Sequence, residues 1–136
     1  MPALLLSLLC LAGCTSSNAR PGAPDAATQL QSIPLAQPDK LKDVKGWSNP
    51  YLIVRTDGVA LLDMTNQEEK VYKPQELPQV LAALPASSWP LGRVVAVTIR
   101  PSDDSEQQKA QLRENRALVA GTLQQLKIYV NWINSK

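Results

Sequence analysis

Histidine and phenylalanine are absent from this 136-residue chain, which has only two cysteines, Cys10 and Cys14. The lack of histidine excludes the Ser-His-Asp and Cys-His triads, the commonest general base and the usual transition-metal ligand. The 14 Lys and Arg residues nearly balance the 12 Asp and Glu residues, which leaves a net charge of +2. Because this balance gives no general attraction to polyanions, we expect no nucleic-acid partner. The length fits one domain of ordinary size.

The chain begins with a short apolar run that ends in a cysteine. Residues 3–12 read ALLLSLLCLA, the length of a signal-peptide h-region and far short of the roughly 20 residues that span a bilayer. The run ends in Leu11-Ala12-Gly13-Cys14, which resembles the lipobox of bacterial lipoproteins. This resemblance implies cleavage before Cys14, a diacylglyceryl group on its thiol, and a further acyl chain such as palmitate on its new amino group.

The lipobox resemblance implies that neither cysteine remains as a free thiol. Residues 1–13 would leave as a signal peptide, and Cys14 would carry lipid, so no thiol or disulfide chemistry remains. Two or three acyl chains anchor a protein stably, because each buried methylene contributes roughly 0.8 kcal/mol. Thr15 stands where an Asp often marks inner-membrane retention, so a periplasm-facing place on the outer membrane is favoured over the inner. The alternative is that residues 3–14 form a buried helix. No Lys or Arg precedes the apolar run, which raises the option of a start codon upstream of Met1.

Residues 14–45 have the composition of a flexible, Pro-rich tether. They contain no aromatic residue and no sustained period, and their prolines are Pro21, Pro24, Pro34 and Pro38. Such a segment buries too little apolar surface to offset its ordering entropy. We therefore predict a disordered coil with a reach of roughly 30 Å. The alternative is that residues 30–41 dock on the domain, with Ile33 and Leu35 as anchors.

The folded domain is predicted to span residues 46–136 and to begin with a hairpin. Residues 51–56 are β-branched and aromatic, and residues 59–64 make the return strand. Asp57-Gly58 between them predicts a type I′ turn, in which both central residues need positive φ.

The rest of the domain alternates helices and strands. Residues 71–72 are expected to extend the hairpin pairing briefly. Residues 74–84 have leucine and valine at i, i+3, i+4 and i+7, which predicts a helix. Residues 94–99 are apolar throughout, as in a central strand, a long helix runs to about residue 126, and residues 127–133 form a last strand. The order ββαβαβ predicts an α+β fold, a small sheet of about four strands with two helices packed on one face.

This order of elements resembles the periplasmic domain of the ExbD/TolR family. The residues that carry the resemblance are Tyr51–Val54, Asp57-Gly58, Glu76-Leu77, Val94–Ile99 and the passage from Leu118 to Val130. Members of that family have an N-terminal transmembrane helix with a proton-carrying Asp, whereas this chain has a lipid signal, so proton-driven work is not implied. The resemblance implies a small periplasmic module, with a homodimer as one option, that binds an envelope protein or peptidoglycan.

Candidate chemical residues are few, and we expect no catalytic residue, metal or cofactor. The adjacent carboxylates Glu68-Glu69 are most simply solvated side chains, and Asp103-Asp104 is placed to stabilise a helix N-terminus, with Asp103 and Glu106 as a capping box. Trp89 lies between prolines in a predicted loop, where it is either a lid over the core or an exposed anchor for a partner.

Three functions remain open from the sequence. The first is a lipid-anchored binding or scaffolding module that contacts an envelope protein or peptidoglycan. The second is a structural accessory subunit of a larger envelope complex. An enzyme is the least favoured, because no carboxylate or lysine spacing supports one.

Overall fold

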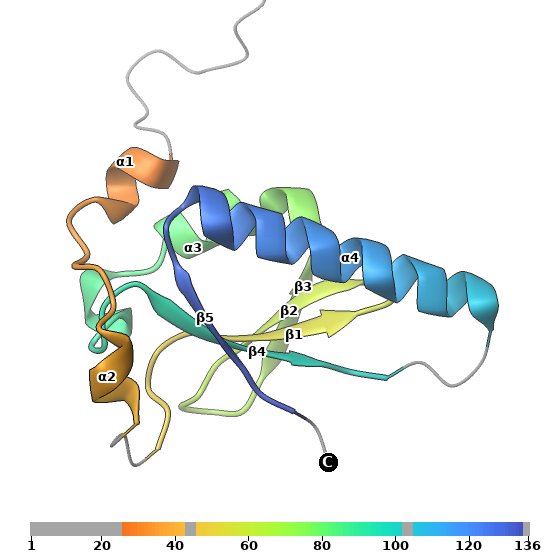
Figure 1. Ribbon diagram of the computed structural model, residues 1–136, viewed down its shortest axis with the longest axis horizontal. Helices are drawn as coiled ribbons and strands as arrows, with labels where there is room; N and C mark the ends of the chain where they lie inside the picture. The colour runs from red at the N-terminus through yellow and green to blue at the C-terminus, as the bar shows by residue number, and fades with distance from the viewer. Residues whose placement is uncertain (1–25, 43–45, 102–104, 135–136) are drawn as a thin grey trace, which may run out of the picture.

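A computed structural model describes residues 26–42, 46–101 and 105–134 of the chain. These residues form an α+β fold around one mixed sheet, in which five strands are arranged in the order β3-β2-β1-β4-β5 (Figure 1). The strands are β1 (Tyr51–Arg55), β2 (Gly58–Leu62), β3 (Glu69–Tyr72), β4 (Val94–Ile99) and β5 (Tyr129–Trp132). The helices are α1 (Ala26–Leu30), α2 (Pro38–Leu41), α3 (Leu77–Ala82) and α4 (Glu106–Gln125), with short 3-10 turns at Pro74–Glu76 and Ala86–Ser88.

The predicted fold class is confirmed, and β3 adds a fifth strand to the four expected. β1 pairs with β2 and β2 with β3 in antiparallel fashion, while β4 lies parallel to both β1 and β5. The parallel pairs follow from the helices between their strands, because a parallel connection needs a crossover of about a dozen or more residues. α3 lies in the first crossover and α4 in the second.

The hairpin turn is shifted by one residue from its predicted position. Arg55 pairs with Gly58, so the two-residue loop is Thr56-Asp57 and Gly58 already belongs to β2. Gly58 has φ +147°, and a Cβ there would lie 2.3 Å from the carbonyl oxygen of Tyr72 on β3. Glycine is therefore required at this position because β3 approaches the backbone closely.

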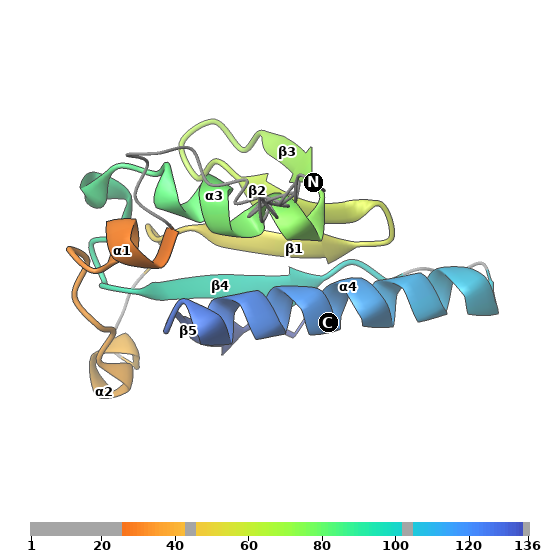
Figure 2. The same cartoon turned by 90° about the horizontal axis from the view of Figure 1, so that it is seen from above.

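Helices cover only one face of the sheet. Figure 2 shows α3 and α4 side by side over the strands, with α1 beside α3. The core between the layers contains alternate residues of the strands, such as Leu52, Val54, Val95 and Val97, together with Leu77 and Leu81 of α3 and Val119 and Leu123 of α4. None of the helices within the described ranges has the length and apolar character of a membrane span.

The folded domain begins before residue 46, which corrects the predicted tether boundary. Leu30, at the end of α1, is 2% exposed and packs in the core together with Ile33. The docking alternative therefore applies to this segment, although Leu35 is 58% exposed and is not an anchor. Backbone pairing also holds the segment, because the Arg93 N–H donates to the Pro34 carbonyl at 2.8 Å. Two buried apolar side chains and backbone pairing therefore dock a segment whose composition is typical of a linker.

Candidate functional site

The sheet face opposite the helices carries a network of four charged residues. Arg55 ends β1 and Arg100 directly follows β4. Since β1 and β4 are parallel neighbours, both arginines leave the sheet at the same end. Asp57 lies in the β1–β2 turn and Glu69 begins β3.

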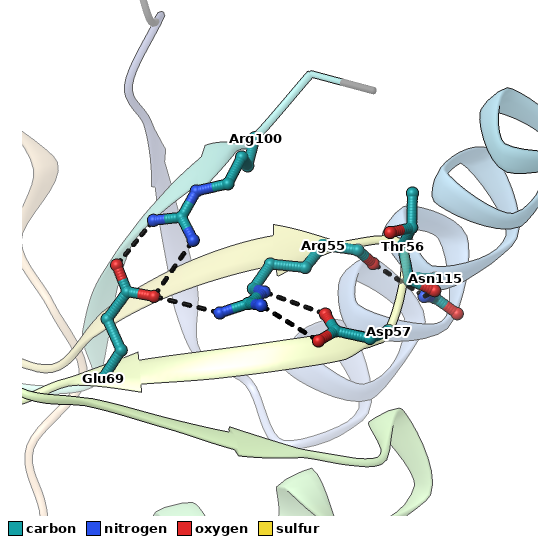
Figure 3. Close-up of polar contacts among 6 residues, drawn as sticks. All are labelled: Arg55, Thr56, Asp57, Glu69, Arg100 and Asn115. Carbon is teal, nitrogen blue, oxygen red and sulfur yellow. Dashed lines mark hydrogen bonds and ion pairs between the residues drawn. The ribbon is translucent and has the colours of Figure 1, made fainter. Parts of the chain in front are cut away.

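Glu69 accepts hydrogen bonds from both arginines (Figure 3). Arg100 binds it in bidentate fashion, with Nη2 2.5 Å from Oε1 and Nη1 3.1 Å from Oε2. Arg55 Nη1 donates to Oε2 at 3.2 Å, while Arg55 Nε and Nη2 donate to the two oxygens of Asp57 at 2.8 and 3.0 Å. The planar guanidinium groups are thus held in fixed orientations, which single surface ion pairs seldom achieve.

The arginine side chains lie along the sheet to reach Glu69. Glu69 pairs with Leu62, which pairs with Tyr51, and Tyr51 lies four residues before Arg55 on β1. The aliphatic part of Arg55 therefore extends over the middle of this face, as amphipathic side chains commonly do on apolar surfaces. Ile53 and Ala60, which lie on the same face, are buried although no described helix covers them.

Asn115 of α4 holds the β1–β2 turn from the opposite side of the sheet. It is 4% exposed, and its Nδ2 donates to the carbonyl oxygens of Arg55 at 2.8 Å and Thr56 at 3.2 Å. Its Oδ1 accepts from Gln111 Nε2 at 3.0 Å. A buried amide that satisfies two turn carbonyls fixes the backbone from which Arg55 and Asp57 project (Figure 3).

Glu69 and Arg100 each stabilise the charged form of the other. Hydrogen bonds from Arg100 are the main cause that lowers the pKa of Glu69, and the charges of Arg100 and Arg55 lower it further, against the opposing effect of burial. The hydrogen bond to Glu69 in turn raises the pKa of Arg100. Because Glu69 is held ionised and Arg100 protonated, this pair does not exchange protons near neutrality, and the arrangement is suited to binding charged groups.

A hollow of about 650 Å³ lies next to the network and shares Glu69 with it. Apolar and charged side chains both line it, among them Leu61, Met64, Tyr72, Asp63, Glu68 and Lys70. Its size falls in the range of small-ligand sites. No group of three or more potential metal ligands occurs in the part of the chain that the structure describes.

The structure separates the residues that the sequence singled out. Cys14 and the Asp103-Asp104 pair lie outside the described residues, and Ser105 caps α4 by accepting from the Gln108 N–H. Trp89 is 3% exposed and packs in the core. Of the two alternatives for this residue, it is therefore the lid over the core and not an exposed anchor for a partner. Of the Glu68-Glu69 pair, only Glu69 joins the arginine network.

Sequence reasoning missed Arg55, Arg100 and Asn115. The signal for the arginines was present, because Arg55 ends one apolar strand, Arg100 follows another, and the two strands are parallel. Asn115 precedes the buried Val119 by four residues and so lies on the apolar side of α4, where a polar residue indicates a specific hydrogen-bond partner. The identity of that partner depends on the tertiary fold.

Comparisons of the chain with protein-family models, with curated proteins and with solved structures found no match.

Proposed function

We propose that this protein is a membrane-anchored bacterial lipoprotein whose small α+β domain is a binding or scaffolding module for an envelope protein or peptidoglycan. The observation that supports it most is the helix-free face of the sheet, where Arg55 and Arg100 are held in place by carboxylates. Preorganised guanidinium groups on an open face favour recognition of polar or anionic groups, since little side-chain entropy is lost on binding. The resemblance to the ExbD/TolR domain agrees with this role.

The membrane anchor is tested by changing the proposed lipid-bearing residue. Cys14→Ser should abolish incorporation of radiolabelled palmitate and leave the chain uncleaved or released from membranes. The matched control is Cys10→Ser, which lies in the proposed signal peptide and should keep labelling intact. Unchanged mass and membrane fractionation of the Cys14→Ser chain would refute the anchor.

The binding role is tested by mild crosslinking in cells followed by purification of the full chain, and by co-sedimentation with purified peptidoglycan. Arg100→Ala should reduce capture of the partner or of peptidoglycan at least fivefold. Lys40→Ala is the matched control, because it removes an exposed cation outside the network and should leave capture unchanged. A chain that captures neither kind of partner would contradict the proposal.

A structural accessory subunit of a larger envelope complex is the second candidate. It is favoured by large apolar side chains on the surface of the described chain: Leu35, Val71, Leu118, Tyr129 and Trp132. A subunit of this kind depends on its complex for stability. A cooperative melt of the purified chain as a monomer, at the same temperature as in membranes, would count against this candidate.

A further inference from the structure

β5 forms an open edge of the sheet. It follows β4 as the last strand in the sheet order, and no strand among the described residues lies beyond it. Tyr129 and Trp132 are 46% and 41% exposed. Successive side chains of a strand point to opposite faces of the sheet, so these two residues, three positions apart, lie on opposite faces. The edge therefore offers an aromatic contact on each side of the sheet.

The backbone groups that face outward can be assigned from the pairing with β4. The Tyr129 N–H donates to the Arg93 carbonyl and the Ile133 N–H to the Val97 carbonyl, both at 2.8 Å. Backbone groups alternate between the two sides of a strand. The N–H and C=O of Val130 and Trp132 therefore point away from β4, where a further strand could pair with them.

β5 lacks the charged residues and proline that commonly protect an edge strand. Its residues Tyr129–Trp132 include no charged residue and no proline, whereas the opposite edge, β3, carries charged Glu69 and Lys70. Charged residues and proline on edges discourage pairing with other chains. The difference between the two edges indicates that β5 is the one suited to accept a strand.

The side of α4 next to β5 is positively charged. The Arg116 guanidinium lies 5.0 Å from the centre of the Trp132 ring, which places Arg116 above the β5 edge. Arg113 lies three residues earlier and Lys109 four residues before that, so the three cations share one side of the helix. Lys109 pairs with Glu106 at 3.3 Å, while no carboxylate in the described ranges pairs with Arg113 or Arg116.

We propose that the β5 edge binds an extended, acidic segment of a partner protein, which adds to the sheet as a sixth strand. This inference rests on the proposed function as a binding module and names the chemistry of its partner. Backbone pairing with Val130 and Trp132 provides affinity, and side chains at alternate positions provide specificity. Acidic residues on the helix side meet Arg113 and Arg116, and apolar residues on the other side meet Tyr129.

Charge also distinguishes this partner from a second copy of the chain. Two copies paired through β5 would bring the cationic sides of their α4 helices together, and like charges across an interface weaken association. An acidic strand has the opposite effect, because its carboxylates are attracted to the same two arginines. The edge is therefore assigned to a different polypeptide with complementary charge.

The test uses the purified full chain and a fluorescein-labelled peptide of alternating glutamate and valine, ten residues long. Fluorescence anisotropy should show binding at least tenfold tighter than that of the matching lysine and valine peptide. Amide hydrogen exchange gives a position-specific readout. The Val130 and Trp132 amides should exchange at least tenfold more slowly with the acidic peptide, whereas the Tyr129 and Ile133 amides, which already donate to β4, should change little.

Two pairs of variants separate charge from backbone pairing. Arg113→Glu combined with Arg116→Glu should weaken peptide binding at least tenfold, while Lys40→Glu combined with Lys42→Glu, at exposed positions in and after α2, should change it less than twofold. Trp132→Pro removes an outward N–H and should abolish binding. Trp132→Thr keeps that N–H and a strand-forming residue, so it should retain more affinity than the proline variant. Circular dichroism checks that each variant is folded.

The outcomes distinguish this inference from the proposed function. Equal binding of acidic and basic peptides, or full binding by folded Trp132→Pro, would overturn the acidic-strand inference. A dimer whose Val130 and Trp132 amides are protected without peptide would also overturn it, in favour of a second copy. If the chain captures an envelope partner in cells but fails these tests, the binding module stands and only the edge assignment is lost. If it captures neither an envelope protein in cells nor purified peptidoglycan, the proposed function is refuted even when the peptide binds.

Discussion

Replacing Asn115 is the most direct test of how α4 positions the β1–β2 turn. The buried amide donates to two carbonyl oxygens of the turn and accepts one hydrogen bond from Gln111. Asn115→Ala removes all three interactions and adds none. The carbonyls of Arg55 and Thr56 are then left without this donor on the inner side of the hairpin.

The expected cost follows from the hydrogen bonds that are lost. A hydrogen bond contributes about 1 kcal/mol net, and a buried group left unsatisfied costs about 1–3 kcal/mol. Alanine recovers roughly 0.5 kcal/mol through its better helix propensity. We therefore expect Asn115→Ala to lower the free energy of unfolding by about 2 kcal/mol at pH 7.

Asn115→Asp adds a test with a defined pH dependence. The introduced carboxylate faces two carbonyl oxygens in a buried site, so its pKa should be raised in the folded state. With a raised pKa, the folded state is destabilised most when the aspartate is ionised. This destabilisation decreases as pH falls towards about 3.9, the pKa of aspartate in the unfolded chain. Asn115→Asp should therefore be less stable than Asn115→Ala at pH 7, and the gap should narrow as pH falls. Other groups that titrate, including Glu69, are common to both variants and cancel in the comparison.

Urea denaturation followed by tryptophan fluorescence measures these differences. Gln124→Ala is the matched control, because Gln124 is an exposed amide on the same helix, and it should change the free energy of unfolding by less than about 0.5 kcal/mol. An Asn115→Ala variant as stable as this control would refute the structural role of the amide. A gap between the aspartate and alanine variants that stays constant with pH would refute the buried-carboxylate argument.

Three further predictions concern the network, the turn and the domain boundary. Glu69→Gln should lower the free energy of unfolding by about 1 kcal/mol at pH 7 in low salt. Because the pKa of Glu69 is lowered in the folded state, the difference between the variant and the original chain should disappear as pH falls below the ordinary carboxyl range. Equal stability of the two chains at pH 7 would contradict this prediction. Gly58→Ala should cost more than about 2 kcal/mol and speed amide exchange in β3, because a Cβ would clash with the Tyr72 carbonyl; thermal melts and hydrogen exchange measure both. Leu30→Ala should lower the free energy of unfolding, measured by chemical denaturation, by about 2–5 kcal/mol, whereas Leu35→Ala at an exposed position should lower it by less than about 0.5 kcal/mol. Equal effects of the two substitutions would argue against a domain that begins before residue 46.

Local patterns were sufficient to predict four of the five strands and the helices α3 and α4. The unbroken apolar run at residues 94–99 predicts a central strand, and β4 lies between β1 and β5. The helical spacing after Pro74 predicts α3, whose Leu77 and Leu81 are buried. These predictions succeed because periodic burial is a property of a single segment against a layer, and it needs no knowledge of the partner segment.

Contacts between distant segments were beyond these patterns. The tether prediction failed at Leu30 and Ile33 because composition averages over a segment, while docking depends on a complementary site beside α3. The turn prediction was displaced by one residue because Gly58 is required by its closeness to Tyr72 on β3, and not by the local turn alone.

The sequence by itself determined the α+β class, the order of β1, β2, α3, β4, α4 and β5, and the exclusion of histidine-dependent chemistry. Only the tertiary structure decided that Arg55, Arg100 and Glu69 form one network, that Asn115 holds the turn beneath it, and that β5, without charged residues or proline, is an edge of the sheet. The physical reason is that secondary structure follows from periodic burial within a segment, whereas a site is made by side chains that strand order and register bring together.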